Sequence, residues 1–187
     1  MKIYVIIIMI LLSGQNLVRA QRLIKGQRGI ETGAGLLADR QPDKNNFFTY
    51  LLLSINKRNG AYLFYQVEYN RKSYEGENFN IPVETYLGKV GYSFPLLTDP
   101  ARNIGLNLGI AGTAGYSDIN RSNYTLNSGA GIINRSGFVY GASLTLSLEV
   151  FITDYCQLLF RGNTDILFGS SVNRLNPTAG LGIRFIL

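Results

Sequence analysis

Strict alternation of apolar and polar side chains over residues 137–150 constrains the fold of this chain more than any other feature. In this segment, GFVYGASLTLSLEV, every even position from Phe138 to Val150 is apolar. The odd positions hold Gly, Ser, Thr or Glu, with Val139 as the exception. A period of two residues predicts a β-strand with one apolar and one polar face. In a soluble sandwich the apolar face points inward, whereas in a membrane barrel it points outward at lipid.

Seven other segments have strand-like patterns and are separated by turn signals such as Asn59-Gly60, which suits a tight hairpin turn. The chain is rich in Gly, Tyr and Phe, a composition that favours an all-β protein. We therefore predict one all-β domain, a small antiparallel up-and-down β-barrel of about eight strands. The expected strands lie near residues 28–37, 47–56, 61–71, 82–94, 103–116, 137–150, 155–168 and 177–187.

Three features favour a barrel of the outer-membrane type. Several expected strands are longer than strands of soluble proteins and long enough to cross a membrane at a tilt. The polar faces are rich in Gly, Ser, Thr and Asn, which fit the narrow interior of an eight-stranded barrel. Tyr and Phe recur near the strand ends, as in the aromatic girdles of membrane barrels; they are Tyr92, Phe94, Tyr116, Phe138, Tyr140 and Phe168. A soluble periplasmic barrel with the same alternation reversed is the alternative.

Charged side chains on the polar faces are the candidate site residues of this barrel, and we expect their role to be structural. An unpaired charge is costly inside a protein, so we expect these side chains to pair with one another. A tight turn at Thr153-Asp154 would place Glu149 near Leu159 and Arg161, which predicts a Glu149–Arg161 ion pair. The expected interior cluster consists of Lys89, Glu149, Arg161, Asp165 and Arg184.

The two ends of the chain carry targeting signals. Residues 1–20 combine Lys2, a short apolar run and the small-residue pattern Val18-Arg19-Ala20, which predicts a secretory signal peptide cleaved after Ala20. The apolar run is too short for a membrane-spanning helix. The barrel domain is then expected over residues 21–187. The last residues, GIRFIL, resemble the closing-strand signal of outer-membrane barrels at Gly182, Phe185 and Leu187.

The composition argues against catalysis. The chain contains no His, which removes Ser–His and Cys–His pairs and the commonest zinc ligand. Its single cysteine, Cys156, lies on the apolar side of its expected strand. We predict no enzyme activity, no metal and no cofactor. The formal net charge is +6, but the basic residues are scattered in runs of two at most, so direct nucleic-acid binding is not expected.

Four long segments of the chain are distinctive, and they are QRLIKGQRGIE, PVETYLGKVGYSFPLLTDPARNIGLNLGIAGTAGYSDINR, GFVYGASLTLSLE and NPTAGLGIRF. They resemble the TraO family, conjugal transfer proteins carried by conjugative transposons of Bacteroides and related bacteria. The resemblance covers essentially the whole chain. It implies a part in the mating apparatus that moves transposon DNA between cells, and it supplies no catalytic residues.

The leading hypothesis is a non-enzymatic envelope component in the outer membrane that contributes to or braces the secretion channel of a conjugation system. Its expected partners are other proteins of that apparatus and outer-membrane lipid, and an oligomer is compatible with the sequence. The expected contact surfaces are loops near residues 39–46, 72–81 and 117–136. The alternative function is a small periplasmic or outer-membrane barrel that binds a lipid or another apolar ligand.

Overall fold

The computed structural model describes residues 24–37, 46–76, 79–100, 103–119, 136–169 and 174–187. The expected signal peptide, residues 1–20, and the start of the expected domain lie outside these residues. Within them the chain forms eight strands and one short 3-10 helix, η2 (Arg58–Gly60). The strands are β1 (Arg28–Leu37), β2 (Phe47–Asn56), β3 (Tyr62–Gly76), β4 (Phe79–Thr98), β5 (Ile104–Ile119), β6 (Gly137–Thr153), β7 (Cys156–Phe168) and β8 (Leu175–Ile186).

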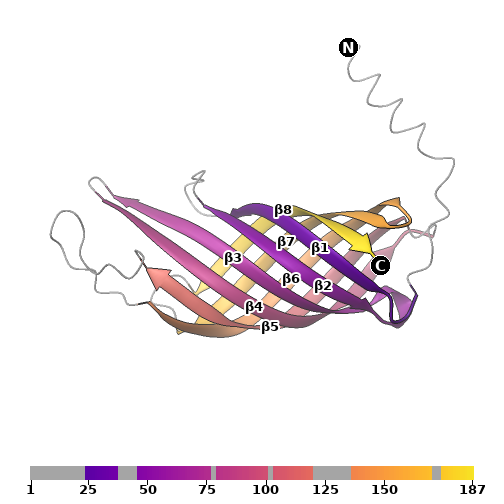
Figure 1. Ribbon diagram of the computed structural model, residues 1–187, viewed down its shortest axis with the longest axis horizontal. Coiled ribbons are helices and arrows are strands. Elements are labelled where there is room, and N and C mark those ends of the chain that lie inside the picture. The colour runs from indigo at the N-terminus through magenta and orange to yellow at the C-terminus, as the bar shows by residue number, and fades with distance from the viewer. Residues whose placement is uncertain (1–23, 38–45, 77–78, 101–102, 120–135, 170–173) are drawn as a thin grey trace, which may run out of the picture.

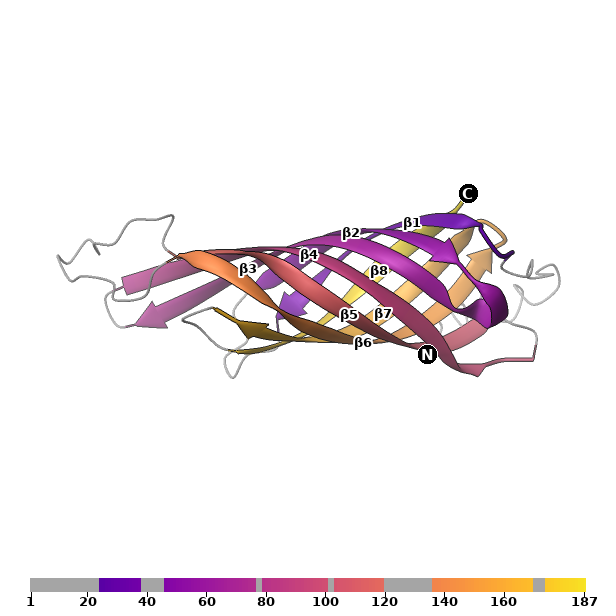
Figure 2. The same ribbon diagram turned by 90° about the horizontal axis from the view of Figure 1, so that it is seen from below.

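Each strand pairs antiparallel with its neighbours in the chain, and β1 pairs with β8 to close the barrel. The predicted all-β, up-and-down barrel of eight strands is therefore confirmed (Figures 1 and 2). We call the end where β1 begins and β8 ends the turn end, because the short connections at residues 57–61 and 154–155 lie there. The opposite end, where β1, β3, β5 and β7 finish, is the far end.

The strands are staggered as in closed membrane barrels. A row of paired residues that starts at Leu37 on β1 can be followed around the barrel to Asn56 on β2, whose backbone N–H donates to the carbonyl of Gln27. The row leaves β1 at Leu37 and comes back to the same edge of the chain at Gln27, just before β1. The stagger is therefore ten residues, the difference between positions 37 and 27. This stagger over eight strands corresponds to a tilt of about 40°. The intermediate partners are Thr178, Asn163, Thr145, Gly109, Ser93 and Tyr62.

The apolar side of the alternating pattern faces outward. On β6, Leu144 and Leu146 are 53% and 47% exposed, whereas Ser143 and Ser147 are 3% and 2% exposed. The same arrangement recurs around the barrel, where large apolar side chains are exposed and polar or charged ones are buried. This inversion of the pattern of a soluble protein is typical of the outer-membrane type of barrel.

Aromatic rings and glycines fill the interior beside the polar residues. Phe48, Tyr50 and Phe64 are buried. A Cβ atom at Gly33 would lie 2.6 Å from the Tyr50 ring, and one at Gly91 would lie 2.6 Å from the Phe64 ring. These inward-facing glycines therefore leave the space that the rings occupy.

On the outside, aromatic side chains gather near the far end. Tyr69 and Tyr86 are neighbours with ring centroids 5.2 Å apart, and Tyr140 and Phe168 have theirs 6.1 Å apart. Tyr116 and Phe138 continue the row of Tyr69 and Tyr86 across β5 and β6. These residues form one aromatic girdle of the kind that lies at a membrane interface.

Several expected boundaries require correction. The first two strands have the expected bounds, but residues 72–81 were expected to form a loop and instead extend the β3–β4 hairpin, with Tyr74 opposite Ile81. The extension lies beyond the last residues that pair with β2 and β5, so it stands outside the barrel wall. Neither of its faces therefore needs the alternation of apolar residues that is typical of the wall. The expected loop at 117–136 starts later, since β5 continues to Ile119. Of the expected loop at 39–46, only Asn46 is described, and its Oδ1 accepts a hydrogen bond from the backbone of Ser73.

No helix among the described residues is long and apolar enough to span a membrane.

Candidate functional site: ion clusters inside the barrel

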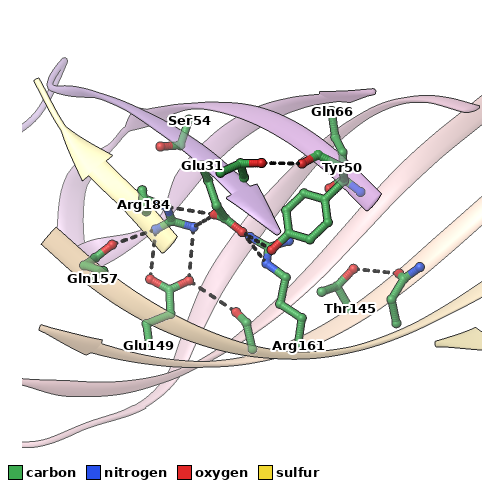
Figure 3. A network of polar contacts seen from close by, with 12 residues as sticks. Glu31, Tyr50, Ser54, Gln66, Thr145, Glu149, Gln157, Arg161 and Arg184 are labelled. Atoms are coloured by element: carbon green, nitrogen blue, oxygen red, sulfur yellow. Dashed lines mark hydrogen bonds and ion pairs between the residues drawn. The ribbon is translucent and has the colours of Figure 1, made fainter. Parts of the chain in front are cut away.

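Two groups of charged side chains lie inside the barrel. The first, which we call the Arg184 cluster, consists of Glu31 on β1, Glu149 on β6, Arg161 on β7 and Arg184 on β8 (Figure 3). Arg184 Nη2 lies 2.8 Å from Glu31 Oε2, and its Nη1 lies 2.9 Å from Glu149 Oε2. Arg161 Nη2 donates to Glu31 Oε2 at 2.9 Å. Two guanidinium groups and two carboxylates therefore balance in charge.

Uncharged side chains complete the Arg184 cluster. The Tyr50 hydroxyl donates to Glu31 Oε1 at 2.6 Å, and the Tyr62 hydroxyl donates to Glu149 Oε1 at 2.7 Å. Gln157 Oε1 accepts from Arg184 Nη1 at 3.1 Å. The Arg184 guanidinium also lies 4.4 Å from the centre of the Tyr62 ring, within the range of a cation–π contact. These contacts stabilise the charges of Glu31, Glu149 and Arg184, which would strongly destabilise the barrel if they were buried without partners.

The second group, the Lys89 cluster, consists of Glu68 on β3, Lys89 on β4 and Asp165 on β7. Lys89 Nζ lies 2.8 Å from Glu68 Oε2 and 2.8 Å from Asp165 Oδ1. Amide groups donate to both carboxylates: Gln66 and Asn70 to Glu68, and Asn163 to Asp165. One ammonium group thus bridges two carboxylates that come from opposite sides of the barrel.

The expected cluster residues all face inward, but they pair differently from the expectation. Glu149 lies opposite Leu159 in the hairpin, in the expected register. Arg161, however, makes its ion pair with Glu31, and Glu149 makes its own with Arg184. The reason is that an inward-facing side chain in a narrow barrel can reach across the interior as well as along its own hairpin.

Sequence reasoning missed Glu31 and Glu68, which are 0% and 4% exposed. For both residues, the alternation of inward and outward side chains along the strand indicates an inward position. Glu31 alternates with Ile30 and Thr32, which face outward, and Glu68 alternates with the outward-facing Val67. Each carboxylate could therefore have been assigned to the interior before its partner was known.

The residues of the expected closing-strand signal occupy both faces of β8. Gly182 lies inside, where a Cβ atom would collide with the Tyr50 hydroxyl. Phe185 and Leu187 are 52% and 68% exposed on the outer surface. Nothing in this arrangement tests recognition by the insertion machinery, so that role remains a prediction.

One small cavity lies among the described residues inside the barrel. This cavity, near the far end and lined by Asn70, Lys72, Thr85, Ser117 and others, has a volume of about 30 Å³. That is room for one or two water molecules. Larger hollows lie on the outer surface between outward-facing apolar side chains such as Leu146 and Phe160. The described residues hold no group of three or more potential metal-binding side chains.

The clusters therefore cross-link the wall of the barrel from within. Their side chains come from six of the eight strands, β1, β3, β4, β6, β7 and β8, and meet in the middle of the interior. They tie opposite walls of the barrel together, since Lys89 on β4 and Glu68 on β3 meet Asp165 on β7. An interior occupied by side chains is what an eight-stranded barrel allows, in contrast to the open channel of larger barrels.

Solved structures share this fold. The attachment invasion locus protein Ail of Yersinia pestis has a TM-score of 0.57 at 14% identity, over 88% of this chain and 100% of that one. Neisserial surface protein A has a TM-score of 0.48 at 11% identity, over 85% of this chain and 94% of that one. At such identities the likeness to Ail shows the fold alone, that of a small outer-membrane-type β-barrel. No curated protein has a sequence that matches this chain significantly.

A family model matches nearly the whole chain. The family is described as conjugative transposon protein TraO, and the match covers residues 24–187, from just before β1 to the last residue. It includes every strand that contributes a side chain to the two clusters. The chain belongs to the TraO family of conjugative transposon proteins.

Proposed function

We propose that the protein is a non-enzymatic component of a conjugative DNA-transfer apparatus that resides in the outer membrane and braces the secretion channel. Membership of the TraO family supports the part in conjugation. The apolar exterior with its aromatic girdle supports the location in a membrane. Export by a signal peptide cleaved after Ala20, which leaves a domain from residue 21 to 187, belongs to the same proposal.

The observation that carries the bracing role is the cross-linked interior. Arg184 alone bridges carboxylates from β1 and β6, and the cavity described near the far end has room for only a water molecule or two. A barrel cross-linked in this way is rigid and does not itself conduct DNA. Its contribution to transfer must therefore come through partner proteins or further copies of itself, with no direct contact to nucleic acid.

The far end offers the surface for such partners. The β3–β4 hairpin projects beyond the wall of the barrel there, as Figures 1 and 2 both show. Its outermost pairs, from Ser73 opposite Pro82 to Gly76 opposite Phe79, lie past the last residues that pair with β2 and β5. A hairpin held out from a rigid barrel is a suitable contact site for other proteins of the apparatus.

Deletion of the gene should abolish or strongly lower transposon transfer while growth of the donor cells continues. Complementation with the wild-type chain should restore transfer, and the restored protein should fractionate with outer membranes and resist carbonate extraction. The measurement is the number of recipients that acquire the transposon per donor. Unchanged transfer after deletion would contradict the role in conjugation, and a protein found only in the soluble fraction would contradict the location.

A barrel that binds a lipid or another apolar ligand is the second candidate function. The interior gives it little support, because the described cavity is small and partly lined by polar side chains. The hollow beside Leu146 and Phe160 lies on the outer surface, where membrane acyl chains would fill it in any case.

A further inference from the structure

The outward-facing apolar surface is much shorter on one side of the barrel than on the other. On β3 it runs from Leu63 to Tyr69, after which Arg71 takes the next outward position. On β6, which lies three strands away around the barrel, the apolar surface runs from Phe138 to Ile152. At a rise of about 3.4 Å per residue and a tilt of about 40°, these runs span about 16 Å and about 36 Å along the barrel axis.

Both edges of the apolar surface diverge between these two sides. Tyr69, Tyr86, Tyr116 and Phe138 form one row of paired residues across β3 to β6. Because of the stagger of the strands, that row climbs about 3 Å per strand, or about 9 Å in all, toward the far end. At the turn end, Leu63 lies about 10 Å closer to the middle of the barrel than Ile152, by the same geometry.

Basic residues border the short side at the turn end. Arg28 on β1 occupies the outward position below Ile30, and Lys57 occupies the one below Ile55. Register places these two residues diagonally across the β1–β2 ladder, since Arg28 lies opposite Ile55. Lys25 and Arg58 follow them on the adjoining turns. These charges cannot lie in hydrocarbon, and they are suited to the phosphate groups of lipid headgroups.

We infer that the membrane is thinned where it meets β1–β3, with headgroup phosphates of its turn-end leaflet held by Arg28 and Lys57. This rests on the proposed location in the outer membrane. The apolar band of a typical barrel is about 25 Å tall, so lipid of normal thickness is too thick for β3 and too thin for β6. Tilting the whole barrel could bring one edge of the apolar surface parallel to the membrane, but it would make the slope of the other edge steeper. The bilayer itself therefore adjusts, at a modest cost for each ångström of mismatch.

The absence of Trp from the chain permits a direct test. Four single-tryptophan variants, Tyr69→Trp, Phe138→Trp, Leu63→Trp and Ile152→Trp, are placed in vesicles that contain lipids brominated at defined depths. If the bilayer follows the apolar surface, Tyr69→Trp and Phe138→Trp lie at equal depth in one leaflet, and Leu63→Trp and Ile152→Trp lie at equal depth in the other. A difference of about 9 Å within the first pair or about 10 Å within the second, the offsets expected of a flat bilayer, overturns the inference.

A second measurement does not depend on tryptophan. The variant with Arg28→Leu and Lys57→Leu lengthens the short side and should fold best in lipids with longer acyl chains than the wild type prefers. Arg174→Leu is the matched control, because this exposed residue lies at the far end beside the tall side and should leave the preference unchanged. An unshifted preference in the double variant contradicts the inference. Failure of every chain to enter any bilayer would instead contradict the proposed location.

Discussion

Replacing Arg184 with methionine should destabilise the barrel by about 3–5 kcal/mol, the usual cost of breaking a buried ion pair on one side. The arginine is 2% exposed and contacts both Glu31 and Glu149. Methionine fills similar space but leaves those carboxylates with fewer opposite charges in the middle of the barrel. The measurement is the urea midpoint of unfolding in lipid vesicles, followed by the shift of the folded band on an unheated gel.

A combined variant separates this effect from a simple loss of packing. Adding Glu149→Gln to Arg184→Met removes one of the two carboxylates that the arginine neutralises. If charge imbalance dominates, the double variant should recover part of the lost stability, since both variants have the same methionine. A double variant less stable than Arg184→Met alone would show that Glu149 does not depend on Arg184. A loss of less than about 1 kcal/mol for Arg184→Met would contradict the importance of the cluster.

Replacing Gly141 with alanine should cost about 3 kcal/mol, at the upper end of the usual range for overpacking. Gly141 lies on β6, and an added Cβ atom would collide with the backbone carbonyl oxygen of Ile166 on β7. A backbone atom cannot move aside by rotation, so the β6–β7 pairing must shift. The chevron of folding and unfolding rates, or the same urea midpoint, measures the loss.

Gly162 provides the matched control for Gly141. It lies on the neighbouring strand with an exposed surface, and nothing would lie within 4 Å of an added Cβ atom. Gly162→Ala should therefore leave the barrel unchanged or stabilise it by about 0.5 kcal/mol, because alanine loses less backbone entropy on folding. Equal effects at the two positions would show that the close approach of β7 to Gly141 does not matter.

Much of the fold follows from local patterns in the sequence. The bounds of β1 and β2 are the expected ones, because each strand is a clear run between turn or polar segments. The β3–β4 hairpin is longer than expected, since its outer part reads as a polar loop such as KSYEGENFN. Beyond the barrel wall, the two strands continue to form hydrogen bonds with each other. Neither strand has an apolar face there, so the sequence does not show the alternation that predicts a strand.

The ion clusters illustrate a different limit. The register of Glu149 opposite Leu159 could be predicted from the short turn between β6 and β7. The contact of Arg161 with Glu31 could not, because β7 and β1 are not adjacent strands. Which inward side chains meet across the interior depends on the stagger of the whole barrel. The stagger depends on the registers of all eight strand pairs together, so it cannot be predicted from any single hairpin.

The central claim is that the apolar face of each strand covers the outside of a closed barrel and contacts lipid. Lipids with a photoactivatable group in the acyl chain test it most directly on the wild-type protein, with the crosslinked residues located by mass spectrometry. We expect crosslinks on β6 at outward residues such as Leu144, Leu146 and Leu148, and none at Ser143, Ser147 or Arg184. Crosslinks at the inward residues, or none on the outward ones, would contradict the claim.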